Sequence, residues 1–309
     1  MAHVVISEFM DEAAVARLSA AHRVAYEPAL VEDRDRLIGM AAGADALIVR
    51  NRTQVDAELL AKAPRLRCVG RLGVGLDNID IPACAERSIT VYPATGANDQ
   101  AVAEYVIAAV LMLLRRAYAA TAEVAAGAWP RTQLMGHEVA GKTLGLIGYG
   151  AIARQVAARA QALGMEIAAS DPHLPAEDPA WADVTRLGLS DLLAQADAVS
   201  LHVPLTAETR HLLGAEAIAA MKPGAVLVNA ARGGVVDEAA LIEALGARQL
   251  GGAAVDVFET EPLSAAAGAR FDGAPNLILT PHIAGVTVEA NARVSHLIAD
   301  RVLQHLEGP

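Results

Sequence analysis

The stretch Leu144-Gly-Leu-Ile-Gly148-Tyr-Gly150-Ala-Ile-Ala153 decides the fold of this 309-residue chain. An apolar run ends at closely spaced glycines and is followed by a helical pattern, which predicts a strand, a tight turn and a helix. The first glycine permits the turn, the second lets a ligand approach the backbone, and the small Ala153 allows close helix–strand packing. The helix is expected to open at Ala151 and Ile152, where backbone N–H groups favour a diphosphate. We therefore predict a dinucleotide site at this turn.

An acidic residue stands where such a turn requires one. Asp171 follows Ala153 by 18 residues, after the apolar run Ile167–Ser170. A carboxylate at this point binds ribose hydroxyls and repels a 2′-phosphate. No arginine adjoins Asp171 in the sequence, although His173 could soften the preference. The cofactor predicted is NAD rather than NADP.

Short apolar runs alternate with helical patterns on both sides of the turn, which is typical of βαβ units and parallel sheets. Ahead of it we predict strands at 3–6, 46–49 and 68–72, with helices over 11–19 and 56–63. From the turn onward we predict strands at 143–147, 167–170, 198–202, 225–229, 252–257 and 277–280. A long apolar helix over 99–115 separates the two series, and a helical tail over 290–306 is expected to return to the first series.

These patterns predict an α/β protein with two Rossmann-like domains. A doubly wound parallel-sheet NAD domain would occupy residues 99–285. A discontinuous, flavodoxin-like substrate (catalytic) domain would occupy 1–98 plus 286–309. A content of 54% hydrophobic and 20% charged residues is enough for two cores.

Composition and charge argue against several classes of protein. The formal net charge of −11 disfavours nucleic-acid binding, because no basic stripe is present to neutralise phosphates. The apolar run Val102–Leu114 contains Glu104 and is too short for a bilayer, so no membrane association is expected. Cys68 and Cys84 lack metal-site spacing and are expected to be reduced thiols, with no metal bound. The first residues predict a strand rather than a signal peptide, which favours a cytoplasmic protein.

Three residues suited to carbonyl chemistry follow predicted strands of the second series. Arg232 lies in Val228-Asn-Ala-Ala-Arg232-Gly-Gly, Glu261 in Asp256-Val-Phe-Glu-Thr-Glu261-Pro, and His282 in Thr280-Pro-His-Ile-Ala-Gly285. Taken singly, each has a simpler interpretation: Arg232 as a surface arginine, Glu261 as a turn cap and His282 as a buried histidine. Together they offer a carboxylate anchor, an orienting acid and a proton donor at the carboxyl edge of one sheet, where open α/β sheets bind ligands.

With these motifs the chain resembles the D-isomer-specific 2-hydroxyacid dehydrogenase family over nearly its whole length. The family includes phosphoglycerate dehydrogenases and glyoxylate/hydroxypyruvate reductases, and the chain also looks like its sulfolactate dehydrogenase branch. The resemblance rests on the ordered occurrence of Gly70-Arg-Leu-Gly73-Val-Gly75-Leu-Asp77-Asn78, Gly148-Tyr-Gly150, Leu201-His202-Val-Pro204-Leu-Thr206, Asn229-Ala-Ala-Arg232-Gly, Asp256-Val-Phe and Pro281-His282.

The resemblance implies a role for each site residue. Arg232 would bind the substrate carboxylate and polarise the keto oxygen. His282 would be the general acid in reduction and the base in oxidation, and Glu261 would hydrogen-bond to its imidazole. The implied NAD contacts are Gly148, Tyr149, Gly150, Ala151, Ile152, Asp171, His202, Val203, Pro204, Ala230, Ala231, Asp256, Ala284 and Gly285. The implied substrate contacts are the backbone around Leu72, Gly73, Val74 and Gly75, with Asn98 at the domain cleft.

The substrate class depends on Arg50, in Val49-Arg50-Asn51-Arg52-Thr53. An arginine here suits a second anionic group, as in sulfolactate, malate or phosphoglycerate, although a solvated loop arginine is the simpler alternative. Simple glyoxylate or hydroxypyruvate reduction remains open. A non-enzymatic NAD-sensing protein of the corepressor type is a further alternative. A homodimer is expected, because the helix over 99–115 and the alanine-rich segment 117–128 carry more apolar surface than one packed face requires, with Trp129 as a possible anchor.

Overall fold

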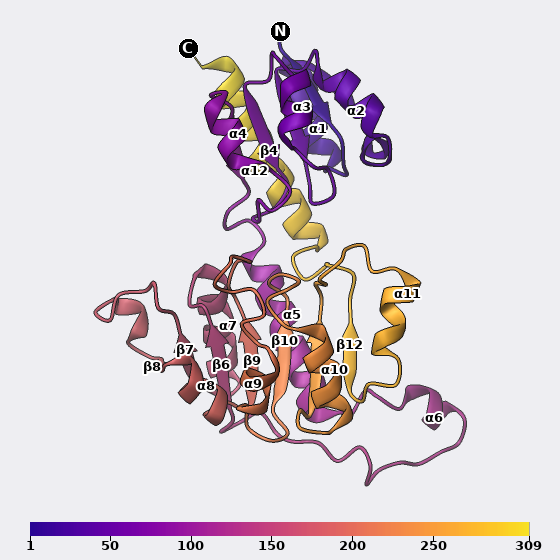
Figure 1. Ribbon diagram of the computed structural model, residues 1–309, viewed down its shortest axis with the longest axis vertical. Coiled ribbons are helices and arrows are strands. Elements are labelled where there is room, and N and C mark those ends of the chain that lie inside the picture. The colour runs from indigo at the N-terminus through magenta and orange to yellow at the C-terminus, as the bar shows by residue number, and fades with distance from the viewer. Residues whose placement is uncertain (309) are drawn as a thin grey trace. The chain divides into compact units, whose positions relative to one another are not determined.

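The computed structural model describes residues 1–308, which form two compact units (Figure 1). The first unit comprises residues 1–98 and 286–308, and the second comprises Asp99–Gly285. Each unit is an α/β body with one parallel sheet, as the sequence predicted. None of the helices among residues 1–308 has both the length and the apolar character that crossing a bilayer requires.

The first unit is built on five parallel strands in the order β2-β1-β3-β4-β5. This is the flavodoxin-type order. The strands are β1 (His3–Ile6), β2 (Arg23–Tyr26), β3 (Ala46–Val49), β4 (Cys68–Arg71) and β5 (Thr90–Pro93). A buried core lies on each face of the sheet. Residues of α1 (Glu12–Ala21) and α12 (Val288–Glu307) form one core, and residues of α2 (Arg34–Ala41), α3 (Ala57–Lys62) and α4 (Ile81–Glu86) form the other.

The second unit has seven parallel strands in the order β12-β11-β10-β9-β6-β7-β8. They are β6 (Thr143–Ile147), β7 (Glu166–Ser170), β8 (Thr185–Arg186), β9 (Ala198–Leu201), β10 (Val226–Asn229), β11 (Gly252–Val255) and β12 (Leu277–Leu279). Because the chain runs from β6 to β7 on one side and places β9 on the other, the strand order reverses at β6 and β9. This is the switch point at which doubly wound sheets bind dinucleotides.

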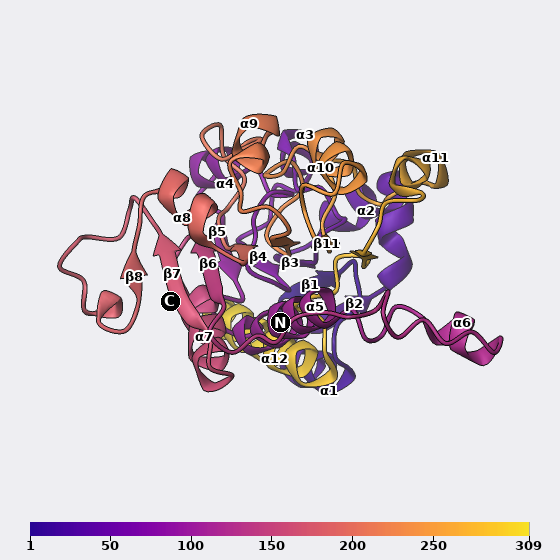
Figure 2. The ribbon, with the colours of Figure 1, turned by 90° about the horizontal axis from the view of Figure 1, so that it is seen from below.

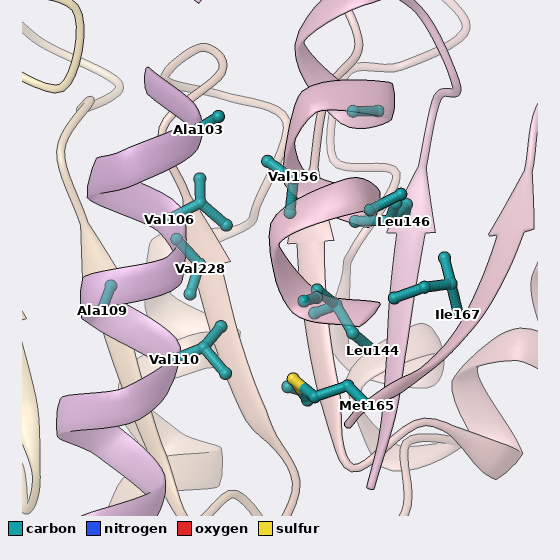
Figure 3. Packing of buried hydrophobic residues seen from close by; sticks show 14 of the residues in the cluster. Ala103, Val106, Ala109, Val110, Leu144, Leu146, Val156, Met165, Ile167 and Val228 are labelled. Atoms are coloured by element: carbon teal, nitrogen blue, oxygen red, sulfur yellow. The ribbon is translucent and has the colours of Figure 1, made fainter. Parts of the chain in front are cut away.

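Two helical layers cover the sheet of the second unit. One core contains α5 (Asp99–Arg115) and α7 (Ala151–Ala162), and Figure 3 shows Val106 and Val110 of α5 beside Val228 of β10. The other core involves α8 (Leu189–Gln195), α9 (Ala215–Ala219) and α10 (Glu238–Gly246). Shorter elements are α6 (Thr121–Ala125), α11 (Ala265–Gly268) and the 3-10 turns Pro28–Glu32, Pro179–Trp181 and Ala269–Phe271.

All nine strands predicted from the sequence are present, several of them one or two residues shorter at the carboxyl end. The three that the sequence did not predict are β2, β5 and β8. Each is an edge strand with exposed or half-buried residues, so its apolar pattern is weak.

The apolar surface that α5 itself leaves for a partner is smaller than the sequence led us to expect. Eight of its residues are buried within the second unit, where the helix packs on α7 and β10. One exposed large apolar side chain, Met112, lies on α5 itself, whereas Tyr118, Val124, Trp129 and Met135 lie beyond its end. Its exposed face is formed by Gln100, Glu104, Ala108, Met112 and Arg115, so the helix has one covered and one open side.

Gly70 of β4 provides a test of how α12 completes the first unit. A Cβ placed on Gly70 would lie 2.5 Å from Cγ2 of Ile298 and 3.2 Å from Cγ2 of Val302. We expect Gly70→Ala to lower the free energy of unfolding by about 1–3 kcal/mol, because a well-packed core cannot absorb an added methyl group without displacement. Chemical denaturation monitored by circular dichroism measures this change. Gly39→Ala is the matched control, since a Cβ on Gly39 meets nothing within 4 Å. Equal stability of the two variants would contradict this packing.

Candidate active site

The glycine turn lies at the switch point, between the ends of β6 and β9. Gly148 has a φ of +85°, which favours glycine, and a Cβ there would lie 2.6 Å from the carbonyl oxygen of His202. The Gly148 N–H donates to the Ser170 carbonyl at 2.8 Å, and the His202 N–H donates to that of Ile147 at 2.7 Å. The turn is therefore fixed from both neighbouring strands.

The start of α7 fits a diphosphate. Gly150 is the N-cap of this 12-residue helix. It has no side chain that could cap the helix, and a Cβ placed on it would meet nothing within 4 Å. The first N–H groups of a helix have no intrahelical acceptor, and its dipole attracts anions. Ala151 is exposed and Ile152 half-buried at this opening. The residues present thus suit the phosphates of NAD.

Asp171 directly follows β7 and is held close to the glycine turn. Its Oδ2 accepts from the Tyr149 N–H at 2.8 Å, and its Oδ1 accepts from the His173 N–H at 2.9 Å. The ring of Tyr149 is buried and stacks on Trp181, with the ring centroids 5.3 Å apart. Tyr149 therefore offers its backbone, rather than its ring, to the turn.

His202, on the other side of the turn, has a buried Nε2 atom without a hydrogen-bond partner among residues 1–308. Burial lowers the pKa of His202 to about 4, so its imidazole is neutral near pH 7. An unsatisfied buried ring nitrogen is costly unless a ligand group or water completes it. This feature is consistent with the predicted cofactor contact. Val203 lies beside Gly148, while Pro204 accepts through its carbonyl from Thr209.

The loop that carries Arg232 is shaped by the residue that ends β10. The buried Asn229 accepts from the Ala231 N–H at 3.1 Å through Oδ1 and donates through Nδ2 to the Arg232 carbonyl at 3.0 Å. Such side-chain-to-backbone bonds fix tight turns. The Arg232 Nη1 donates to the Ala231 carbonyl at 2.5 Å. Asn229 therefore fixes the backbone conformation of Ala230, Ala231 and Arg232.

Glu261 and His282 form a hydrogen-bonded pair that joins the loops after β11 and β12. Nδ1 of His282 lies 2.7 Å from Oε2 of Glu261, and Oε1 of Glu261 accepts from the Phe258 N–H at 3.0 Å. Burial alone would raise the pKa of Glu261. The two hydrogen bonds and the charges of His282 and Arg232 outweigh burial and hold this pKa below its ordinary value. The carboxylate is therefore charged at neutral pH, and the structure brings all three predicted catalytic residues into one electrostatic group.

Asp256 organises the loop that contains His282. Its side chain is fully buried, and its carboxylate accepts from the hydroxyl of Thr280 and the N–H groups of Ile283 and Ala284, at 2.6, 2.9 and 2.8 Å. The Asp256 carbonyl also accepts from the His282 N–H at 2.8 Å. Asp256 therefore acts on the fold of this loop, whatever contact it also makes with the cofactor. Ala284 is buried, and Gly285 is half-buried.

Gly233 sets how closely the Arg232 loop approaches the Glu261 loop. A Cβ on Gly233 would overlap the carbonyl group of Phe258 and come within 2.9 Å of the Glu259 nitrogen. Backbone therefore packs on backbone here, and only glycine permits the approach. The Phe258 N–H, on the same peptide segment, holds Glu261.

The predicted substrate residues lie in the first unit. Glu8 is buried and accepts from the N–H groups of Arg50 and Thr53 at 2.8 and 3.0 Å and from that of Arg52 at 3.2 Å. The Nη1 of Arg50 donates to Oδ1 of Asn291 at 2.9 Å and to the Phe9 carbonyl at 3.3 Å. The Arg50 loop is therefore firmly built.

In the loop after β4, two of the predicted backbone donors are already used. The Leu72 N–H donates to the Val49 carbonyl and the Gly73 N–H to the Arg71 carbonyl, each at 2.8 Å, and the Leu72 side chain is buried. Val74 and Gly75 are the remaining candidate donors for a carboxylate. Asn98 has a buried Oδ1 without a hydrogen-bond partner among residues 1–308.

Sequence reasoning missed four residues as parts of the site: Glu8, Asn229, Gly233 and Thr280. Asn229 gave a usable signal, since an asparagine that ends a strand before a turn is typical of side-chain-to-backbone bonding. The other three act through partners far away in the sequence, so no local pattern reveals them.

The second unit matches a known family. Residues 107–284 match the family model described as D-isomer specific 2-hydroxyacid dehydrogenase, NAD binding domain. The chain is 58% identical over 307 residues to the (S)-sulfolactate dehydrogenase of Chromohalobacter salexigens, covering 99% of each protein. It is 42% identical over 276 residues to the D-3-phosphoglycerate dehydrogenase of Mycobacterium bovis, covering 89% of this chain and 52% of that one. The chain thus spans about half the length of this phosphoglycerate dehydrogenase.

A structural comparison agrees with the family match. A solved structure of a protein from Thermus thermophilus superposes with a TM-score of 0.91 at 35% identity, over 99% of this chain and 97% of that one. The chain belongs to the D-isomer-specific 2-hydroxyacid dehydrogenase family. It is an NAD-dependent oxidoreductase that acts on the CH–OH group of 2-hydroxy acids, which confirms the predicted cofactor and reaction class. The non-enzymatic alternative is set aside.

We expect Gly233→Ala to lower kcat about 100-fold or more, because the added methyl group forces the Arg232 loop away from the Phe258–Glu261 segment. Steady-state NADH oxidation with a 2-keto acid measures the loss. Gly246→Ala is the control, since a Cβ on Gly246 meets nothing within 4 Å. Activity of Gly233→Ala equal to that of the control would show that the backbone contact is not needed.

Proposed function

We propose that this enzyme interconverts sulfolactate and its 2-keto acid, and that Arg232, Glu261 and His282 carry the reaction. The observation that carries the proposal is the His282–Glu261 hydrogen bond within reach of the charge of Arg232. The choice of acid is supported by the near-full-length similarity to the sulfolactate dehydrogenase named above. Malate and phosphoglycerate belong to the same class of acids with a second anionic group.

Each of the three residues has a role that its chemistry supports. The guanidinium of Arg232 binds the substrate carboxylate and polarises the keto oxygen. His282 gives a proton to that oxygen in reduction and takes the hydroxyl proton in oxidation. Glu261 fixes the ring through Nδ1, which leaves Nε2 for the substrate. NAD, when bound, supplies or accepts the hydride at C2 of the acid.

NAD is bound mainly by backbone in this proposal. Gly148, Tyr149 and Gly150 form the turn against which the diphosphate lies, Ala151 and Ile152 offer it the first N–H groups of α7, and Asp171 binds the ribose hydroxyls. The remaining contacts are proposed to come from His202, Val203, Pro204, Ala230, Ala231, Asp256, Ala284 and Gly285. The second unit is accordingly the cofactor domain and the first is the substrate domain. On the first unit, Val74 and Gly75 offer N–H groups to the substrate carboxylate, with Asn98 as a further contact.

Arg50 is proposed to recognise the second anionic group. Only its Nη1 has partners among residues 1–308, so the donors on Nη2 are available for a sulfonate or carboxylate. The same two partners favour a second candidate, a glyoxylate or hydroxypyruvate reductase, because an arginine held within its own unit can be purely structural. The relative turnover of dianionic and monoanionic 2-keto acids distinguishes the two functions.

We expect the enzyme to turn over sulfopyruvate with NADH, and His282→Ala to abolish that turnover. Arg50→Ala should lower kcat/KM for sulfopyruvate roughly 10- to 100-fold, the worth of one charged hydrogen bond, and lower it for glyoxylate much less. Arg52→Ala is the matched control, because Arg52 pairs with Glu32 at the surface. A panel of 2-keto acids, and both enantiomers of each hydroxy acid with NAD, provides the measurement. Equal losses for the dianionic and monoanionic acids would refute the role of Arg50.

We also propose that the protein is a homodimer that assembles through the arm formed by residues 116–136. This arm contains α6 and extends away from the rest of its unit (Figures 1 and 2). Tyr118, Trp129 and Met135 on the arm are 69%, 76% and 71% exposed, which is costly for large apolar side chains unless a partner covers them. A cytoplasmic location is proposed because Cys68 and Cys84 are buried and unbridged.

We expect Trp129→Asp to shift the protein from dimer to monomer, because a buried unpaired carboxylate is unfavourable in an apolar interface. Light scattering coupled to size-exclusion chromatography measures the mass. Val288→Asp is the control, since Val288 is 85% exposed and lies outside the arm. A wild-type monomer, or a Trp129→Asp dimer, would contradict the proposed interface.

A further inference from the structure

We infer that Tyr105 and Thr280 are positioning residues for the reaction, because a chain of hydrogen bonds from α5 through Thr280 to Asp256 fixes the loop that carries His282. Thr280 begins the stretch that contains His282 but has no role predicted from the sequence, and Tyr105 lies outside the sequence motifs of the site. The inference rests on the proposed role of His282, and it adds that this role depends on a tyrosine 175 positions from Thr280.

The number of hydroxyl protons decides which group donates each hydrogen bond between Tyr105, Thr280 and Asp256. The Thr280 Oγ1 donates to Oδ1 of Asp256 at 2.6 Å. A threonine hydroxyl has a single proton, so it cannot also donate to Tyr105, whose Oη lies 2.6 Å from the same Oγ1. Tyr105 therefore donates to Thr280, and Thr280 donates to Asp256. Both bonds are short, as expected where the final acceptor is a charged carboxylate.

The acceptor at the end of this chain is a fully buried side chain. No cation is paired with Asp256 among residues 1–308, so its solvation rests on neutral donors: the Thr280 hydroxyl and the N–H groups of Ile283 and Ala284. A buried carboxylate is tolerated only when such donors satisfy it. Hydrogen bonds in series strengthen one another, so the Tyr105 hydroxyl strengthens the bond that Thr280 makes.

The segment held in this way contains His282. Thr280 precedes it by two positions, and Ile283 and Ala284 follow it directly. His282 has a φ of +55°, a conformation that a residue with a Cβ adopts only when its surroundings impose it. Its N–H donates to the carbonyl groups of Asp256 and Thr280, at 2.8 and 3.1 Å. The strained backbone aims the imidazole at Glu261.

Loss of the Thr280 hydroxyl would therefore act on proton transfer first. Oδ1 of Asp256 would keep one donor, and the Tyr105 hydroxyl would lose its acceptor. The loop could then relax from the left-handed conformation, which would lengthen the His282–Glu261 hydrogen bond. Asp256, Ala284 and Gly285 are proposed NAD contacts in or near this loop. The glycine turn that holds the NAD diphosphate, however, follows another strand, β6, and has its own hydrogen bonds, so affinity for the cofactor should fall much less than kcat.

The test compares Thr280→Val, Thr280→Ser and Tyr105→Phe in the full-length enzyme. We expect Thr280→Val to lower kcat for 2-keto acid reduction roughly 10- to 100-fold, with Tyr105→Phe lowering it about 3- to 10-fold. Thr280→Ser keeps the hydroxyl and should stay within about threefold of wild type. The solvent deuterium isotope effect on kcat should rise in Thr280→Val, because slowed proton transfer limits turnover. The NADH dissociation constant, measured by fluorescence, should change less than about threefold.

Tyr92→Phe is the matched control, since its hydroxyl also has one side-chain partner, His305 at 3.0 Å, but lies in the first unit. An unchanged kcat in Thr280→Val would overturn the inference, as would failure of Thr280→Ser to restore it. A loss of NADH binding in parallel with kcat would show a general structural role instead. Should Thr280→Val fail to fold, Tyr105→Phe gives the same test with a smaller change.

His282→Ala is measured alongside, so that the two proposals can fail separately. Activity in His282→Ala would refute the proposed role of His282. An inactive His282→Ala together with a normal Thr280→Val would refute only the inference about Tyr105 and Thr280.

Discussion

The hydrogen bond between His282 and Glu261 is the interaction on which the rest of the site depends. It joins two loops that follow different strands, and each loop must hold one conformation for the bond to form. The Glu261 loop is fixed by the Phe258 N–H and by its backbone contact with Gly233. The His282 loop is fixed by the buried carboxylate of Asp256. This hydrogen-bonded pair, the proposed acid–base device, thus depends on backbone constraints as much as on its two side chains.

The parallel sheet explains why these loops meet. Strands β10, β11 and β12 are neighbours and run in one direction, so the segments that follow them share one edge of the sheet. The glycine turn after β6 and the Asp171 carboxylate after β7 lie at the same edge of the same sheet. Hydride and proton transfer require the cofactor and the acid–base pair to act on one carbon–oxygen bond. One edge of the sheet therefore holds the predicted cofactor turn and the His282–Glu261 pair in the same unit.

Much of this arrangement could be predicted from the sequence, and the limits have physical causes. The buried strands and the glycine turn have strong local patterns, so their positions were predicted to within two residues. The edge strands β2, β5 and β8 have weak patterns because solvent or neighbouring segments relieve the need for apolar residues. Arg232, Glu261 and His282 could be proposed as catalytic residues because their chemistry is distinctive and each follows a strand. Their supports were not found, because the contacts of Gly233 with Phe258 and of Thr280 with Tyr105 exist only after folding. The substrate is the least predictable feature, since Arg50 has both structural partners and available donors.

The central claim is that His282, held by Glu261, transfers the proton that accompanies hydride transfer. The most direct measurement is kcat/KM for 2-keto acid reduction, with its solvent deuterium isotope effect, in the wild-type enzyme, in Glu261→Gln and in His282→Ala. We predict that His282→Ala is inactive. We also predict that Glu261→Gln loses about 10- to 100-fold in kcat/KM and shows a larger isotope effect, because a neutral amide holds the imidazole less firmly and proton transfer becomes slower. Wild-type values in either variant would contradict this claim.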